Sequence, residues 1–177
     1  LTPSEALKNG VVMVFQENSL VPNMTVSQNI YLGAENFFNS LAKLNIKASR
    51  FLQSLNFNVD PNLLVSQLGA AQKQMVEIAR AVHHNAKVII FDEPTATLTP
   101  EEKHHFFGLM QRLKKEGVSI VFISHALEEA LEHSDRITVL RDGELIETDT
   151  ARKFNRERIV KAMIGRDLTD SAESVKS

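Results

Sequence analysis

Short apolar runs alternate with longer amphipathic segments along the chain. The apolar runs, rich in β-branched and aromatic residues, lie at Val11–Phe15, Val88–Phe91 and Val118–Ile123. Runs of this length are typical of strands buried on both faces of a parallel sheet. The segments between them carry apolar residues at helical spacing, mainly across 34–67, 73–84 and 100–117. This alternation predicts an α/β fold in which helices cover both faces of a parallel sheet.

Local signals support several of these elements. Helix starts are indicated at Thr2-Pro3, Thr25–Gln28 and Thr99-Pro100. These segments combine a hydroxyl N-cap with either a capping-box Gln or a Pro at the first helical position. Asp142-Gly143 lies between two short strand patterns and predicts a hairpin turn. A last helix is expected over 156–164, followed by a polar tail.

Composition places the chain among ordinary globular proteins. Its 177 residues suit one domain or a large part of a bigger protein, and the 43% hydrophobic and 24% charged residues are typical values. The net charge of −2 gives no general electrostatic reason to bind nucleic acid or an anionic membrane. The sequence has no cysteine, which excludes disulfides and thiolate metal sites, and no apolar stretch long enough to span a bilayer. We therefore expect a cytosolic location, with a partner providing any membrane span.

Polar residues suited to phosphate chemistry follow all three strand patterns. Gln16 follows the first, the pair Asp92-Glu93 the second and His125 the third. Because the carboxyl ends of parallel strands share one sheet edge, these side chains can converge. One carboxylate suffices near Mg²⁺, which keeps several waters; a second can deprotonate an attacking water, and a histidine can donate to a γ-phosphate oxygen. Taken singly, the acids also fit a solvated turn, and Gln16 fits an ordinary loop.

A second candidate site precedes the predicted helix 73–84. Gly69, Ala70, Ala71 and Gln72 leave the start of this helix uncrowded. An open helix N-terminus presents free N–H groups and the positive end of the helix dipole, which together bind anions. The same residues also fit a helix start that merely lacks large side chains.

Five segments in order make the chain similar to the nucleotide-binding subunits of ABC transporters. The segments are FQENSLVPNMTVSQNIYLG at 15–33, LGAAQKQMVEIARA at 68–81, VIIFDEPTATLT at 88–99, FISHALEEA at 122–130 and DRITVLRDG at 135–143. They resemble, respectively, the Q-loop segment, the signature motif with its helix, the Walker B strand with the D-loop, the switch-histidine segment and the hairpin after it. The resemblance covers about Pro3 to Leu168. More narrowly, the chain resembles the first half of the tandem ATPases of bacterial monosaccharide importers, the ribose, galactose and xylose type.

The resemblance implies a P-loop NTPase-like fold of the ABC ATPase type, with an inserted helical subdomain. Residues 1–17 would be part of the α/β core with the Q-loop strand, and 18–86 the helical subdomain with the signature motif. Residues 87–168 would complete the α/β core, and 169–177 would be a tail.

The resemblance also implies roles for single residues, with ATP and Mg²⁺ as cofactors. Asp92 would hold magnesium through water, and Glu93 would be the general base. Gln16 would sense magnesium and the attacking water and couple the site to a membrane partner. His125 would contact the γ-phosphate.

Two further segments would act between subunits. Gly69, Ala70, Ala71 and Gln72 would face the nucleotide bound by a second ATPase unit, because such sites are shared between two units. Residues 95–99 would line the dimer contact. Residues near 18–24, together with the helical insert, would meet the membrane-spanning permease subunit, and a periplasmic or extracellular sugar-binding protein would act indirectly.

The sequence departs from the family pattern in three places. No G-x-x-x-x-G-K-[ST] motif occurs in it, and the family has this phosphate-cradling loop upstream of the Gln16 segment. We therefore expect an internal fragment, incomplete at its N-terminus, with no useful ATP affinity alone and an exposed sheet edge that favours association. Gly69 stands where the family usually has Ser, which removes a hydroxyl donor. Ala126 stands where Lys or Arg is common.

Three functions are weighed on this basis. The first is the ATP-hydrolysing subunit of a sugar importer at the cytoplasmic face of a bacterial membrane. The second is a catalytically silent fragment that serves only as a dimerisation or docking module. The third is an ABC ATPase of DNA repair or translation, which the mildly acidic charge and the importer-like Q-loop segment disfavour. No nucleic-acid partner is expected.

Overall fold

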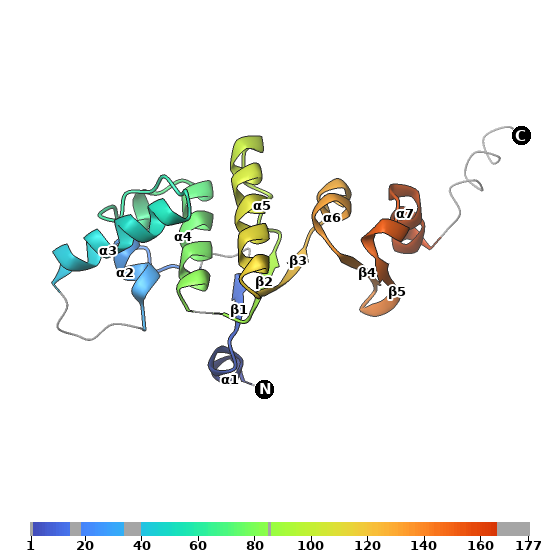
Figure 1. The fold of residues 1–177 in the computed structure, drawn as a ribbon, viewed down its shortest axis with the longest axis horizontal. Coiled ribbons are helices and arrows are strands. Elements are labelled where there is room, and N and C mark those ends of the chain that lie inside the picture. Colours follow the sequence, from blue (N-terminus) through green and yellow to red (C-terminus); the bar gives the residue numbers. More distant parts are fainter. Residues whose placement is uncertain (1, 15–18, 34–39, 85, 166–177) are drawn as a thin grey trace, which may run out of the picture. The chain divides into compact units, whose positions relative to one another are not determined.

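The computed structural model describes residues 2–14, 19–33, 40–84 and 86–165 (Figure 1). These residues fall into two compact units, 1–123 and 124–177. The predicted boundaries of the helical subdomain, at 17/18 and 86/87, stay a prediction. Over the described part of the chain, no helix is long and apolar enough to cross a membrane.

The first unit is built on the predicted parallel sheet. Its strands are β1 (Val11–Val14), β2 (Val88–Asp92) and β3 (Ser119–Ile123), in the order β1-β2-β3. Both pairings are parallel and unstaggered, so Val14, Phe91 and Phe122 lie side by side across the sheet. The carboxyl ends of the three strands therefore share one edge, as predicted.

The two faces of this sheet differ. One face carries Ile89 and Phe91, which are fully buried. On the other face Met13, Val121 and Ile123 are 37%, 47% and 46% exposed. The prediction of a sheet covered on both faces is therefore wrong for the described residues. The apolar pattern shows that both faces suit burial, but it does not show that an element is present to cover each one.

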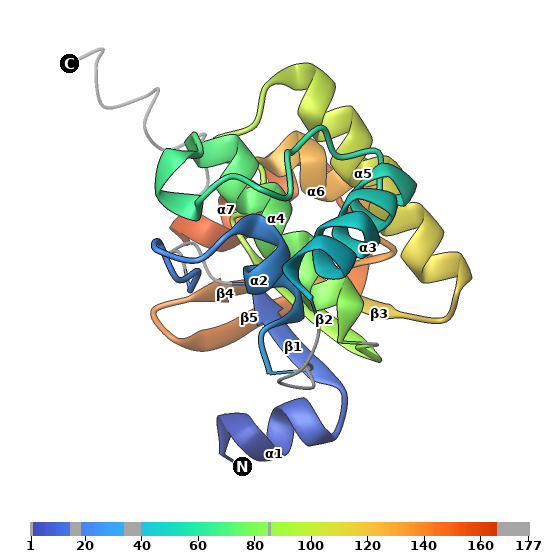
Figure 2. The ribbon, with the colours of Figure 1, turned by 90° about the vertical axis from the view of Figure 1, so that its left-hand side faces the viewer.

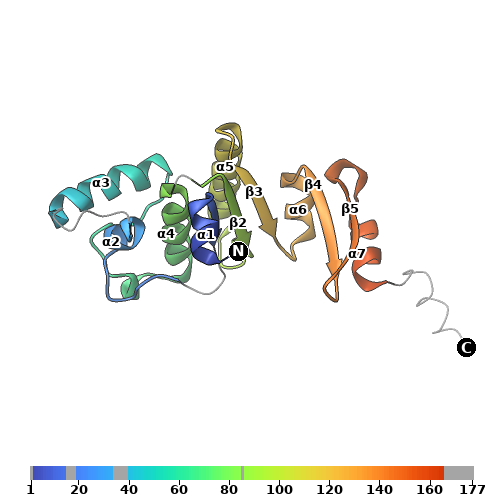
Figure 3. The same ribbon diagram turned by 90° about the horizontal axis from the view of Figure 1, so that it is seen from below.

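Helix α5 (Pro100–Lys115) covers the buried face. Its Phe106 ring packs edge-on against Phe91, with ring centroids 5.2 Å apart, and its Phe107 ring packs against Phe122 at 5.8 Å. Helix α4 (Ala70–His83) lies toward the β1 edge of the sheet and α5 toward the β3 edge, as Figures 1 and 3 both show. In both helices the apolar residues that recur at helical spacing in the sequence form the face that packs into the core.

Smaller helices complete the first unit. They are α1 (Pro3–Lys8), α2 (Val26–Tyr31), α3 (Leu41–Ser54) and the 3₁₀ turn η1 (Val65–Gln67). Figure 2 shows α2, α3 and α4 side by side. The prediction of mainly helix across 34–67 is wrong between α3 and η1. Asn56 takes a left-handed conformation with φ of 61°, which ends α3, and the next residues form a loop. Residues 34–39, with Phe37 and Phe38, lie outside the described part of the chain.

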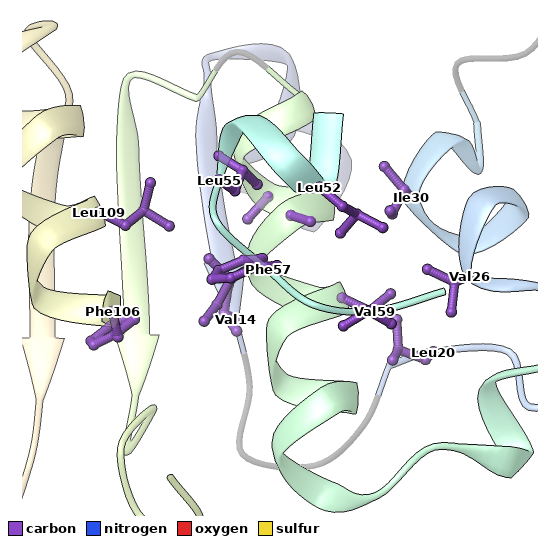
Figure 4. Close-up of a cluster of buried hydrophobic side chains, with 14 of the residues drawn as sticks. Val14, Leu20, Val26, Ile30, Leu52, Leu55, Phe57, Val59, Phe106 and Leu109 are labelled. Carbon is purple, nitrogen blue, oxygen red and sulfur yellow. The ribbon is translucent and has the colours of Figure 1, made fainter. Parts of the chain in front are cut away.

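One continuous hydrophobic core joins these elements. Leu52 of α3, Ile30 of α2 and Val14 of β1 all belong to it, and the loop after α3 contributes Phe57 and Val59 (Figure 4). Because this loop buries the side chains of Phe57 and Val59, it belongs to the same core as the helices around it.

The second unit is a hairpin with two helices. Its elements are α6 (Leu127–His133), β4 (Arg136–Arg141), β5 (Glu144–Thr150), the 3₁₀ turn η2 (Ala151–Lys153) and α7 (Arg156–Ile164). The predicted turn is present, with Asp142 and Gly143 at φ of 53° and 82°. Ile137, Val139 and Ile159 anchor a small separate core.

Candidate functional site

Asp92 and Glu93 lie at the carboxyl end of β2, as the sequence predicts. Asp92 is the last residue of the strand, lies next to Ile123 in the sheet register and is half-buried. The Glu93 backbone N–H donates to the carbonyl oxygen of Ile123 at 2.9 Å, which extends the ladder by one residue. Glu93 itself has φ of 48°, in the left-handed region. The chain therefore turns sharply at the second carboxylate while that residue stays attached to the sheet.

The turn after Glu93 leads directly into α5. Thr95 is buried, whereas Ala96 and Thr97 are exposed. Thr99 caps α5 through a capping box: its N–H donates to Glu102 Oε2 at 2.8 Å, and the Glu102 N–H donates to Thr99 Oγ1 at 3.3 Å. The segment 95–99, predicted to line a dimer contact, thus combines a buried anchor with an exposed outer side.

Gly69 is the N-cap of α4. It has an ordinary extended conformation with φ of −70°, and a Cβ added there would meet no atom within 4 Å. Its N–H donates to Gln72 Oε1 at 3.3 Å. Gly69 and Ala70 are exposed, and Ala71 and Gln72 are half-buried. A serine would therefore fit at position 69, so the departure from the family pattern is not forced by the backbone.

Two further predicted site residues are not placed relative to this pair. Gln16 lies outside the described residues. His125 belongs to the second unit, where it is exposed between β3 and α6. The Ala126 N–H donates to Ser124 Oγ at 3.0 Å, which forms a tight turn around His125. The structure thus brings together Asp92 and Glu93, and separately Gly69 to Gln72.

The described residues contain no group of three or more His, Asp or Glu side chains that could hold a metal ion by itself. Mg²⁺ does not need such a group, because it binds through one or two carboxylates, several waters and substrate phosphates. Asp92 and Glu93 offer oxygen donors at a sheet edge and so fit that kind of site.

A comparison with family models decides the larger assignment. The model for the ABC transporter family matches residues 2–96, which include β1, α4, β2 and the Asp92-Glu93 pair. The chain belongs to the ABC transporter family.

Among curated proteins, this ABC transporter chain is similar to ATP-binding proteins of sugar import. It is 44% identical to the galactose/methyl galactoside import ATP-binding protein MglA of Clostridium perfringens, over 93% of this chain and 33% of that protein. It is 42% identical to the ribose import ATP-binding protein RbsA of Chelativorans sp., over 95% of this chain and 33% of that protein. The chain therefore spans about a third of the length of these relatives.

Solved structures show the same fold. The dimeric ATP-binding cassette MJ0796 bound to ADP and Pi matches with a TM-score of 0.74, at 27% identity over 87% of this chain and 69% of that one. The ADP conformation of the cassette MJ1267 matches with a TM-score of 0.73 at 27% identity, over 94% and 72%. The predicted ABC ATPase fold is thereby confirmed.

The structure of this ABC transporter chain also contains polar contacts that the sequence did not reveal. The helical pattern marks Met75, Ile78 and Val82 as the buried face of α4, yet Glu77 is also buried and binds Ser19. The only indication in the sequence that Glu77 is buried is its position between Val76 and Ile78. An acid flanked by apolar residues does not by itself indicate burial.

Proposed function

We propose that the chain is part of the ATP-hydrolysing subunit of a bacterial monosaccharide importer. The observation that carries this proposal is the identity of 42–44% to ribose and galactose import ATP-binding proteins, over more than nine-tenths of the chain. The pair of carboxylates at the end of β2 supports it, because this is where open α/β sheets bind ligands.

Asp92 and Glu93 divide the hydrolytic work. Asp92 would hold Mg²⁺, and the ion would supply charge neutralisation at the phosphates. Glu93 is the general base that takes the proton from the attacking water. Its backbone bond to Ile123 fixes the residue at the sheet edge, and the left-handed turn directs the chain away toward α5. Such fixed placement is what a general base requires.

The remaining residues act around this pair. Gln16 contributes to the metal and water position, and His125 donates to the γ-phosphate. Gly69, Ala70, Ala71 and Gln72 present the N-terminus of α4 to ATP held by a second ATPase unit. The exposure of Gly69 and Ala70 supports this role, because an anion can reach the start of the helix.

The proposal implies partners and a location. The membrane-spanning permease subunit docks on the segment around 19–24, whose Val21 is 38% exposed. A sugar-binding protein outside the membrane acts through the permease. The subunit then works at the cytoplasmic face of the cell membrane. The net charge of −2 favours no nucleic-acid partner.

The second candidate is the catalytically silent docking module. It is favoured by one observation: the printed sequence contains no G-x-x-x-x-G-K-[ST] motif. The two candidates differ in ATP turnover by the purified chain, because turnover above background contradicts the silent module.

Sugar uptake tests the importer proposal. The full-length subunit that contains this chain is reconstituted with its permease and binding protein in proteoliposomes. Uptake of labelled ribose, galactose and xylose is then measured with and without ATP on the side of the membrane that carries the ATPase subunit. We expect ATP-dependent uptake of at least one of these sugars. Absence of uptake together with ATP turnover that responds to DNA or RNA in a salt-sensitive manner would contradict the proposal and favour a nucleic-acid ATPase.

A further inference from the structure

The N–H, the carbonyl and the hydroxyl of Ser19 all form hydrogen bonds with side chains of α4. Its backbone N–H donates to Glu77 Oε1 at 2.6 Å, and its hydroxyl lies 3.2 Å from the same oxygen. Arg80, one turn further along α4, donates through Nη1 to the Ser19 carbonyl at 3.1 Å and through Nη2 to the Ser19 hydroxyl. We call Ser19, Glu77 and Arg80 the α4 latch.

The acid of the α4 latch is buried. The Glu77 residue is 3% exposed, and its second oxygen, Oε2, has no hydrogen-bond partner among the described residues. Burial raises the pKa of Glu77, whereas the Ser19 N–H and Arg80 oppose that rise. A buried carboxylate is costly unless it is paired, and an apolar residue packs such a site more cheaply. The hydrogen bonds of Glu77 to the Ser19 N–H and hydroxyl therefore point to a role in holding Ser19.

The residues after Ser19 are attached to the first unit as well. Leu20 is 6% exposed and lies in the core beside Val59 (Figure 4). The Val21 N–H donates to Asn29 Oδ1 at 2.8 Å, and Asn29 Nδ2 donates back to the Val21 carbonyl at 3.1 Å. Asn29 is itself fully buried in α2.

The same segment is bound to the turn that leads into α4. The Ser66 N–H donates to the Pro22 carbonyl at 3.0 Å, and the Val65 N–H donates to the Met24 carbonyl at 3.0 Å. Val65 and Ser66 belong to η1, a few residues before Gly69. Residues 19–24 are thus fixed both to the middle of α4 and to the chain just before its start.

The outer side of this segment is open. Val21 is 38% exposed, and Pro22 and Asn23 are exposed beside it. A segment that is fixed inside and open outside can pass a displacement to the element that holds it, since rigid secondary elements carry coupling between sites.

We propose that Glu77 and Arg80 are positioning residues that couple docking of the membrane partner at residues 19–24 to the position of α4 and its Gly69–Gln72 end. The inference rests on the proposed importer function for its partner, while the latch itself is a property of this chain. Glu77 and Arg80 act through α4 and touch no substrate.

Hydrogen exchange tests the latch without any partner. In Glu77→Gln the backbone N–H of Ser19 loses its charged acceptor, and a charge-assisted hydrogen bond is about twice as strong as a neutral one. We expect the Ser19 amide to exchange about fivefold faster or more. Glu5→Gln is the matched control, because Glu5 also accepts a backbone N–H, from Thr2 at 2.7 Å. Unchanged exchange at Ser19 in Glu77→Gln would overturn the latch.

ATP turnover in the assembled transporter tests the coupling. Turnover of the full-length subunit is measured alone and after reconstitution with its permease and sugar-loaded binding protein. We expect Glu77→Gln to leave the turnover of the subunit alone unchanged and to lower the stimulation by the partner by about fivefold or more, which is a usual size for coupling between sites. A mere loss of stability would lower both the turnover of the subunit alone and its stimulation by the partner. Leu113→Val, which shortens a buried side chain of α5, is therefore the control for stability.

The outcomes separate the two proposals. If the wild-type transporter shows no ATP turnover, the importer function fails and the exchange experiment alone decides on the latch. If turnover is stimulated in the wild type and equally in Glu77→Gln, the importer function stands and the coupling role of Glu77 is refuted. Equal losses in Glu77→Gln and Leu113→Val would refute it too.

Discussion

Glu93 shows what the sequence could and could not predict at the scale of single residues. The acid pair before Pro94 was predicted at a strand end, because the apolar run stops there and the chemistry of both residues is local. The left-handed conformation of Glu93, with φ of 48°, was not predicted. A non-glycine residue in this region costs on the order of 1–3 kcal/mol, and only the tertiary structure can offset that. Here the offset comes from the bond to Ile123 and the burial of Pro94 and Thr95.

The buried carboxylate of Glu77 was missed for a related reason. Spacing along α4 identifies a face, but it does not identify the neighbours on that face. Ser19 is 58 positions away in the sequence. A partner so distant turns an expected surface acid into a buried hydrogen-bond acceptor.

His83 supports a prediction about pH. Its ring packs edge-on against Tyr31, with centroids 4.5 Å apart, and against Phe51 at 5.8 Å. Burial, and then the charges of Lys47 and His84, lower the pKa of His83 below its ordinary value of 6.5. The folded state therefore binds the proton less readily than the unfolded state. This contribution to stability is complete above pH 6.5 and is lost as the pH falls through the lowered pKa.

The measurement is urea unfolding of the first unit between pH 7.5 and 5. We expect its free energy of unfolding to fall with pH in the wild type and to fall less in His83→Phe, which keeps the aromatic contacts and removes the titrating ring. The raised pKa of Glu77 acts in the opposite direction as the pH approaches its ordinary value of 4.5, and it is the same in both proteins. Equal slopes in the two proteins would show that His83 does not contribute.

At the scale of elements, locally determined features were predicted and distant contacts were not. The capping boxes at Thr25 and Thr99 are both present, because each depends on residues three positions apart. The hairpin at Asp142-Gly143 is present for the same reason. The open face of the sheet was not predicted, because three apolar strands have the same pattern whether or not a helix covers them.

The open face of the sheet predicts self-association of the chain. β3 pairs only with β2 among the described residues, and Val121 and Ile123 expose nearly half of their surface. Exposed apolar strands at a sheet edge are templates for pairing with another chain. We expect the isolated chain to form oligomers in sedimentation velocity, and Val121→Lys to shift it toward the monomer.

Leu145→Lys provides the control for that experiment. Leu145 is 62% exposed on β5, in the hairpin of the second unit. The Leu145→Lys substitution changes the charge of the protein by the same amount and leaves the sequence of β1, β2 and β3 unchanged. A wild-type chain that is monomeric and melts cooperatively with ordinary stability would contradict the prediction, and so would an equal effect of the two lysines.

At the scale of the whole molecule, the family and its fold were predictable because five motifs occur in the expected order. Asp92, Glu93 and the start of α4 belong to the first unit, and His125 belongs to the second. The chain thus carries carboxylates suited to hydrolysis, while its sequence contains no phosphate-cradling loop motif.

The role of Glu93 is tested most directly by single-turnover ATP hydrolysis in the full-length subunit. We compare the wild type with Glu93→Gln and with Glu101→Gln, an exposed acid in the first turn of α5. Loss of a general base costs about 10²–10⁴-fold in rate. We therefore expect Glu93→Gln to bind ATP as the wild type does and to hydrolyse it slower by that factor, and Glu101→Gln to hydrolyse it at the wild-type rate. Hydrolysis by Glu93→Gln at the wild-type rate would contradict the assignment of the base.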